Sequence, residues 1–143
     1  MIHFVNVPIT LDASAGEDAP KTITGIAVPW APVSATVMDG TKVSFARGAF
    51  DLSMKNPKLL ENHDMSQLRG VVTSLADMPE GLGFTATFAK TGAAADAIEL
   101  VKAGAYDSVS VGAVPTKFKY DKNGVMVDSQ AVLVESSLVA QPA

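Results

Sequence analysis

The sequence predicts an α+β domain rich in β-strands, with a curled, mostly antiparallel sheet or barrel and one or two flanking helices. Three observations predict this class. Runs of apolar and β-branched residues alternate with clusters of Gly, Pro, Asn and Asp, as strands alternate with turns. Only one segment has clear helical periodicity. Several connections are too short for a crossover between parallel strands, and a curled sheet or barrel would protect its edges.

Length and composition fit one compact unit. The chain has 143 residues, of which 48% are hydrophobic and 18% charged. These values are normal for a globular protein and exclude wholesale disorder, and a second independent core would be cramped. We therefore expect a single domain over residues 1–143.

Strands are expected wherever β-branched and aromatic residues cluster without helical spacing. The expected strands are 2–10, 22–30, 42–45, 59–63, 68–75, 82–88, 108–120 and 125–140.

The segments between the strands carry turn signals. An acidic, breaker-rich loop is expected at 12–20 and a looser stretch at 31–40. Residues 47–54 are short and mixed, and we expect one or two helical turns there. A hairpin turn is expected at 78–81. The tetrapeptide Asp-Lys-Asn-Gly at 121–124 is the strongest hairpin signal in the chain.

One helix is predicted after residue 91. Thr91 can cap its N-terminus, and Gly104 fits its C-terminal stop. An apolar stripe at helical spacing lies between them, formed by Ala94, Ala97, Ile98 and Val101.

Composition excludes several kinds of function. The chain has no cysteine and only two histidines, so thiol nucleophiles, disulfides, thiolate zinc sites and His-rich metal centres are excluded. A net charge of −4 argues against binding to nucleic acid, which needs clustered Lys and Arg. No basic leader and no apolar run of membrane-spanning length are visible, so we expect no membrane partner and a cytoplasm-like compartment.

His63 is the first residue that stands out. It follows the apolar pair Leu59-Leu60 within the segment Asn62-His63-Asp64. A histidine at the end of an apolar strand can be a general base, a metal ligand or a satisfied structural residue. A metal site with Glu61 and Asp64 is the weaker reading, because neighbours on a strand point to opposite faces.

Ser110 and Glu135 complete a candidate constellation. Strand alternation puts Ser108 and Ser110 on one face, and Gly112 allows close backbone approach beside them. Glu135 shares a face with Leu133, Ser137 and Val139; it either needs a buried partner or lies on a solvated face.

A serine hydroxyl needs a base to become a nucleophile, and the base needs a third group to orient it. His63, Ser110 and Glu135 are the economical set. His3 is the rival base, and we interpret it as structural.

Four motifs, in this order, resemble the prohead serine proteases of tailed bacteriophages, which are related in fold to the herpesvirus assemblins. They are Phe-Ala-Arg-Gly-Ala-Phe at 45–50, Glu-Asn-His-Asp at 61–64, Gly104 through Ser-Val-Gly at 110–112, and the C-terminal segment from Leu133. The resemblance runs from about Gly25 to the end of the chain.

The resemblance implies an assemblin-like fold and a serine endopeptidase without a cofactor or metal. It implies His63 as base, Ser110 rather than Ser108 as nucleophile, and an acidic third member at Glu135. Apart from the resemblance, we expect backbone N–H groups to form the oxyanion site, with Arg69 as a candidate contributor, directly or through water. Implied substrates are scaffold and major capsid protein segments and the protease itself, inside the immature capsid (prohead) in the host cytoplasm. A homodimer or an assembly-coupled oligomer is also implied.

Two departures from the family pattern stand out. Ala113 replaces a frequent aromatic residue, and the chain stops at Ala143 where members usually continue, as expected of a trimmed or polyprotein-derived form. Two other functions remain open. A catalytically inactive capsid-assembly or scaffolding module would keep the same motifs. A β-barrel ligand binder would explain the composition but not the placement of His63 and Glu135.

Overall fold

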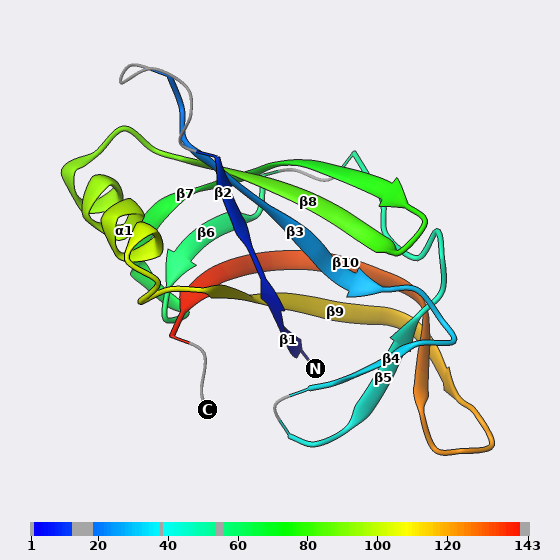
Figure 1. Cartoon of the computed structure of the whole chain (residues 1–143). Coiled ribbons are helices and arrows are strands. Elements are labelled where there is room, and N and C mark those ends of the chain that lie inside the picture. The colour runs from blue at the N-terminus through cyan, green and yellow to red at the C-terminus, as the bar shows by residue number, and fades with distance from the viewer. Residues whose placement is uncertain (1, 13–18, 38, 54–55, 141–143) are drawn as a thin grey trace.

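The computed structural model describes residues 2–12, 19–37, 39–53 and 56–140. Within these residues the chain forms ten strands, all in one sheet, and one helix (Figure 1). The strands are β1 (His3–Pro8), β2 (Thr10–Asp12), β3 (Thr22–Pro29), β4 (Ser34–Thr36), β5 (Lys42–Phe45), β6 (Lys58–Glu61), β7 (Asp64–Met78), β8 (Gly81–Phe88), β9 (Ser108–Tyr120) and β10 (Met126–Val139). The helix is α1 (Gly92–Lys102).

The sheet is mixed but mostly antiparallel, as expected. Its main path runs β1-β9-β10-β6-β7-β8-β3-β2, with β5 added beside β10 and β4 beside β5. Strand β10 pairs in parallel with β5 and β6, and the other neighbouring pairs are antiparallel. Strand β1, at one end of the path, also contacts β3 near the other end, so the sheet is curled (Figure 1).

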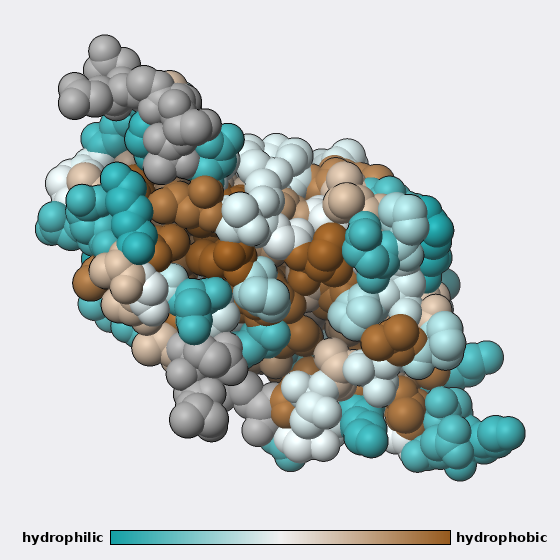
Figure 2. Space-filling view, viewed as in Figure 1, coloured by the Kyte–Doolittle hydropathy of each residue, from teal (hydrophilic) through white to brown (hydrophobic). Residues whose placement is uncertain are grey.

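The inside of the curl holds the hydrophobic core. Its largest fully buried apolar side chains are Phe45, Ile23, Leu59, Leu82, Met126 and Leu138. Each large side chain buried in this way contributes about 1.5–3 kcal/mol to folding. On the face in Figure 2, apolar patches lie between polar residues across the centre of the molecule.

Helix α1 forms with the predicted caps. The Thr91 hydroxyl accepts a hydrogen bond of 3.1 Å from the backbone N–H of Ala94, and Gly104 follows the helix with φ +83°. Ala94 and Ala97 are buried, and the helix packs against β7.

The expected hairpins at 78–81 and 121–124 are confirmed. The prediction of helical turns at 47–54 is wrong, because the described residues of that range form no helix. Residues 47–48 form a turn, and Phe50 makes a parallel bridge to Ala131 of β10. The backbone N–H of Ala131 donates to the carbonyl of Ala49 at 3.0 Å. Pairing with β10 and burial of Ala49 and Phe50 override the local preference. Met54 lies outside the described residues.

Two other segments differ from expectation. The stretch 31–40 contains the short strand β4, which pairs with β5. Of the loop expected at 12–20, Asp12 belongs to β2 and residues 13–18 lie outside those described.

Candidate active site

His63 lies in a two-residue turn rather than at a strand end. Asn62 and His63 connect β6 to β7, and they have φ values of +53° and +59°. Positive φ at both central residues is the signature of a type I′ hairpin turn, in which Asn is favoured at the first position. Because His63 lies in this turn, its side chain does not follow the alternation of strand residues that the sequence predicts.

Hydrogen bonds to β10 hold this turn in place. The backbone N–H of Asn62 donates to the carbonyl of Leu138 at 3.1 Å. The backbone N–H of His63 donates to the hydroxyl of Ser137 at 3.0 Å. Because β6 itself pairs with β10, the backbone of His63 is fixed relative to the strand that carries Glu135.

The His63 ring is hydrogen-bonded to Glu135. Nδ1 of the ring lies against Oε1 of the carboxylate, and the two side chains are 29% and 16% exposed. A carboxylate at Nδ1 favours the tautomer with the proton on that nitrogen, which leaves Nε2 as the acceptor. Nε2 is therefore the ring atom suited to take a proton.

A β-bulge in β10 puts Glu135 on this face. Leu133 pairs with Ala113 and Glu135 pairs with Gly112, so Val134 is left without a partner in the ladder. The extra residue turns Leu133 into the core, where it is 3% exposed. The expectation that Leu133 shares a face with Glu135 is wrong for this reason.

Ser110 lies on the same face of the sheet as Glu135. It pairs with Ser137 of β10 and with Asn6 of β1, and directly paired residues share a face. Ser110 is 1% exposed, and its hydroxyl has no hydrogen-bond partner among the described residues. Leaving a buried hydroxyl unpaired costs about 1–3 kcal/mol, so this hydroxyl is poor as a structural group.

The His63 ring lies over β9, between the two neighbouring strands. It contacts Glu135 of β10 on one side and the ring of Phe4 of β1 on the other, where the ring centroids are 4.4 Å apart. Phe4 and Glu135 both pair with Gly112. A Cβ on Gly112 would lie 3.1 Å from Phe4 Cε1 and 3.2 Å from Glu135 Cγ, so glycine leaves room for these two side chains.

The structure thus brings His63 and Glu135 into contact and places Ser110 nearby. Ser110 is two residues from Gly112 on the same face, and its neighbour Ser137 contacts both the His63 backbone and Glu135. Within the part of the chain described, no hydrogen bond joins Ser110 to His63. Such bonds are often long before substrate binds.

A second polar cluster supports the turn from the other side. Nε of Arg69 donates to Glu61 Oε1 at 2.7 Å, and the Tyr106 hydroxyl donates to Glu61 Oε2 at 3.0 Å. Burial, followed by the hydrogen bond to Glu61, raises the pKa of Tyr106. Arg69 is thus held by a carboxylate.

Some of these contacts could not be predicted from the sequence. Phe4 and Tyr106 carry no signal of their own, since their roles depend on pairing over long sequence distances. The Asn62 signal is local: Asn before His63 between two strands is typical of a type I′ turn.

The other titratable candidates lie elsewhere. His3 faces the core on the opposite side of the sheet, and burial lowers its pKa. Asp64 accepts hydrogen bonds from the backbone and hydroxyl of Ser66, which lower its pKa. The residues that the structure describes include no group of three or more His, Asp or Glu side chains that could hold a metal.

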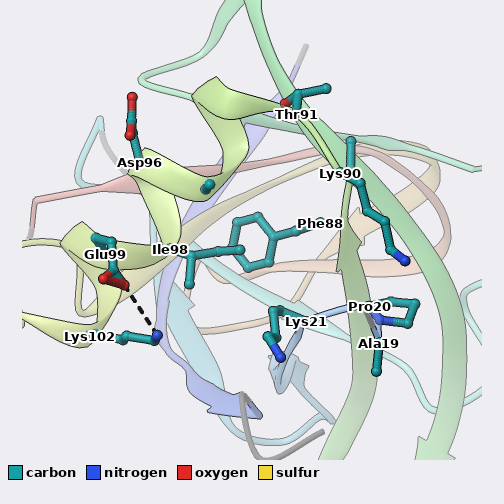
Figure 3. A pocket seen from close by; sticks show the side chains of 12 residues that line it. Ala19, Pro20, Lys21, Phe88, Lys90, Thr91, Asp96, Ile98, Glu99 and Lys102 are labelled. Carbon is teal, nitrogen blue, oxygen red and sulfur yellow. Dashed lines mark ion pairs between the residues drawn. The ribbon is translucent and has the colours of Figure 1, made fainter. Parts of the chain in front are cut away.

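A cavity lies away from this face. It measures about 540 Å³ and lies between α1 and the end of β8 (Figure 3). Phe88 and Ile98 line it, and Lys102 pairs with Glu99 at 3.2 Å on its rim. His63, Ser110 and Glu135 do not line it. Across the ranges described, no helix is long and apolar enough to cross a membrane.

Comparison with known proteins places the chain in a family. The structure is similar to that of the capsid assembly protease of bacteriophage T4, gp21, with a TM-score of 0.70 and 13% identity. The similarity covers 99% of this chain and 97% of that one, and at this identity it concerns the fold. The search of curated proteins found no match. The model of the caudovirus prohead serine protease family matches residues 8–143. Because this match spans nearly the whole sequence, the chain belongs to the caudovirus prohead serine protease family and is a serine peptidase.

Proposed function

We propose that this protein cleaves peptide bonds during prohead maturation through an acyl-enzyme on Ser110, with His63 as general base and Glu135 as its orienting carboxylate. The observation that carries the proposal is the hydrogen bond between Glu135 and His63 Nδ1, on the face that contains the hydroxyl of Ser110, which has no partner among the described residues. The family match supports the reaction class.

In the proposed steps, His63 takes up and gives back one proton in each half of the reaction. Ser110 Oγ attacks the carbonyl carbon of the scissile bond, and its proton moves to Nε2 of His63. The tetrahedral intermediate collapses when His63 returns that proton to the leaving amide nitrogen. A water molecule then attacks the acyl-enzyme as His63 takes its proton, and His63 returns that proton to Ser110 Oγ as the acyl–oxygen bond breaks, which releases the acid product and free Ser110. Glu135 stabilises the imidazolium in both halves.

We propose scaffold and capsid-protein segments as substrates, together with this chain itself, inside the immature capsid in the host cytoplasm. The similar T4 protein is described as a capsid assembly protease. We further propose that assembly, as a homodimer or a larger oligomer, couples activity to the prohead.

The test is co-production of this chain with the capsid and scaffold proteins of its phage. Ser110→Ala and His63→Ala should abolish cleavage while leaving the fold intact. Glu135→Gln should reduce the rate by about 10²–10⁴-fold, because the imidazolium loses its carboxylate. Ser136→Ala is the matched control, since Ser136 faces the core. Unchanged cleavage by purified Ser110→Ala would overturn the proposal.

One observation favours a second candidate. Ser110 is almost fully buried and is not hydrogen-bonded to His63, which also fits an inactive assembly module with the protease fold. That candidate predicts that the unmodified chain enters proheads without cleaving any protein there, and that Ser110→Ala changes neither result.

A further inference from the structure

A small cavity lies beside Ser110 and belongs to neither the catalytic contacts nor the core. It has a volume of about 320 Å³ and is lined by Asn6 and Pro8 of β1, by Ser108 of β9, and by Asp107, which precedes β9. Pro8 pairs with Ser108 and Asn6 pairs with Ser110, so the cavity lies directly next to the proposed nucleophile.

The cavity is on the same face as the catalytic group. Ser108 and Ser110 are two residues apart on β9, a step of about 6.6–6.8 Å along a strand. An extended peptide that ran along β9 would advance at a similar rate, so a substrate side chain within about two residues of the scissile bond would reach this cavity.

The lining groups favour a hydrogen-bond donor. Ser108 is 3% exposed, and its hydroxyl has no partner among the residues described. Asp107 is exposed and carries a carboxylate. An acceptor of this kind beside an unpaired hydroxyl is complementary to an ammonium or guanidinium group and unfavourable for a carboxylate.

We propose that this cavity is a substrate subsite that accepts a Lys or Arg side chain close to the scissile bond, with Asp107 as the residue that selects its charge. The proposal rests on the proposed function for its place in catalysis. The fit of a cationic side chain to the cavity is testable without catalysis.

The first experiment measures binding by NMR on the full chain. Nα-acetyl-lysine amide should shift the backbone amide signals of Asn6, Asp107 and Ser108, and Nα-acetyl-norleucine amide should shift them much less. Asp107→Asn should remove the difference, whereas Asp96→Asn, which changes an exposed carboxylate of α1, should keep it. The difference should shrink in high salt, because an exposed charge is screened. Equal responses to the two probes would overturn the subsite.

The second experiment identifies cleaved sites in a peptide library. One position near the scissile bond should prefer Lys or Arg over norleucine by roughly fivefold in kcat/KM, the size expected of an exposed ion pair. Asp107→Lys should reverse the preference toward Glu. Cleavage without a basic preference would refute the subsite and leave the peptidase intact. Selective NMR binding, together with no cleavage of the library by either the free chain or assembled proheads, would support the subsite and count against the proposed function.

Discussion

Ser137 is the residue that joins the parts of the site. Its hydroxyl accepts a 3.0 Å hydrogen bond from the His63 backbone and lies 3.4 Å from Glu135 Oε1, and Ser137 pairs with Ser110 across the sheet. Removing this hydroxyl should loosen the turn that carries the proposed base and leave the three proposed catalytic side chains unchanged.

We therefore expect Ser137→Ala to lower kcat by about tenfold to hundredfold with little change in KM, the size typical of a displaced catalytic group. Ser136→Ala is a close control, because Ser136 is the preceding residue, is equally buried and faces the core. Steady-state kinetics of both variants measures the effect. Equal kinetics in the two would show that Ser137 does not position His63.

Asp128 is a buried carboxylate outside the site. It is 0% exposed, neither carboxylate oxygen has a partner among the described residues, and burial raises its pKa to about 6. The ordinary value is 3.8. Between about pH 4 and pH 6 the folded protein holds a proton there that the unfolded chain releases. Stability therefore falls as the pH rises through this window, by about 3 kcal/mol in total.

Asp128→Asn should remove this fall. Urea unfolding at a series of pH values from 4 to 8 measures it as the difference between the variant and the unmodified protein. Exposed Asp96→Asn is the control. The carboxyls of Asp51 and Asp64, whose pKa values are lowered by hydrogen bonds from Ser53 and Ser66, titrate at lower pH with the opposite sign and cancel in the comparison. A difference that does not vary with pH would contradict this assignment.

The turn between β6 and β7 is the element on which His63, the proposed base, depends. Asn62 holds φ +53°, a conformation that costs a residue with a Cβ about 1–2 kcal/mol unless it is Asn or Asp. Asn62→Gly tolerates this φ, and Asn62→Ala does not, although both remove the same side-chain amide.

We expect Asn62→Ala to be less stable than Asn62→Gly by about 1 kcal/mol, and to have the lower kcat, since the strained turn carries His63. Thermal unfolding and kinetics of the two variants test this. Equal values would mean that the backbone conformation at Asn62 is not what holds the base.

Elements with local signals could be predicted from the sequence, and elements set by distant pairing could not. The Asp-Lys-Asn-Gly turn and the caps of α1 depend on neighbouring residues, and both are confirmed. The bulge at Val134 and the bridge of Phe50 to Ala131 depend on which strands lie beside β10, and no local pattern encodes that choice. The candidate residues could be selected because a catalytic serine needs specific partners, but their contacts follow from the curled sheet.

At the scale of the whole molecule, the site is assembled from both ends of the chain. Phe4 comes from β1, Ser110 from β9 and Glu135 from β10, and the curl of the sheet and the β6–β7 turn bring His63 over them. The first strand thus supplies one wall of the site.

Phe4→Ala should therefore lower kcat by about tenfold while Val132→Ala, at an exposed apolar residue of β10, should not. Kinetics with a common peptide substrate compares them. A loss of activity that is equal in both variants would point to general destabilisation rather than to support of the His63 ring.

The most direct test of the central claim is covalent trapping in assembled proheads with a serine-directed fluorophosphonate, followed by peptide mass mapping. The account predicts a single modified residue, Ser110, with labelling lost in His63→Ala and retained in Ser136→Ala. Modification of Ser137 or Ser108 instead, or labelling that persists at full level in Ser110→Ala, would contradict it.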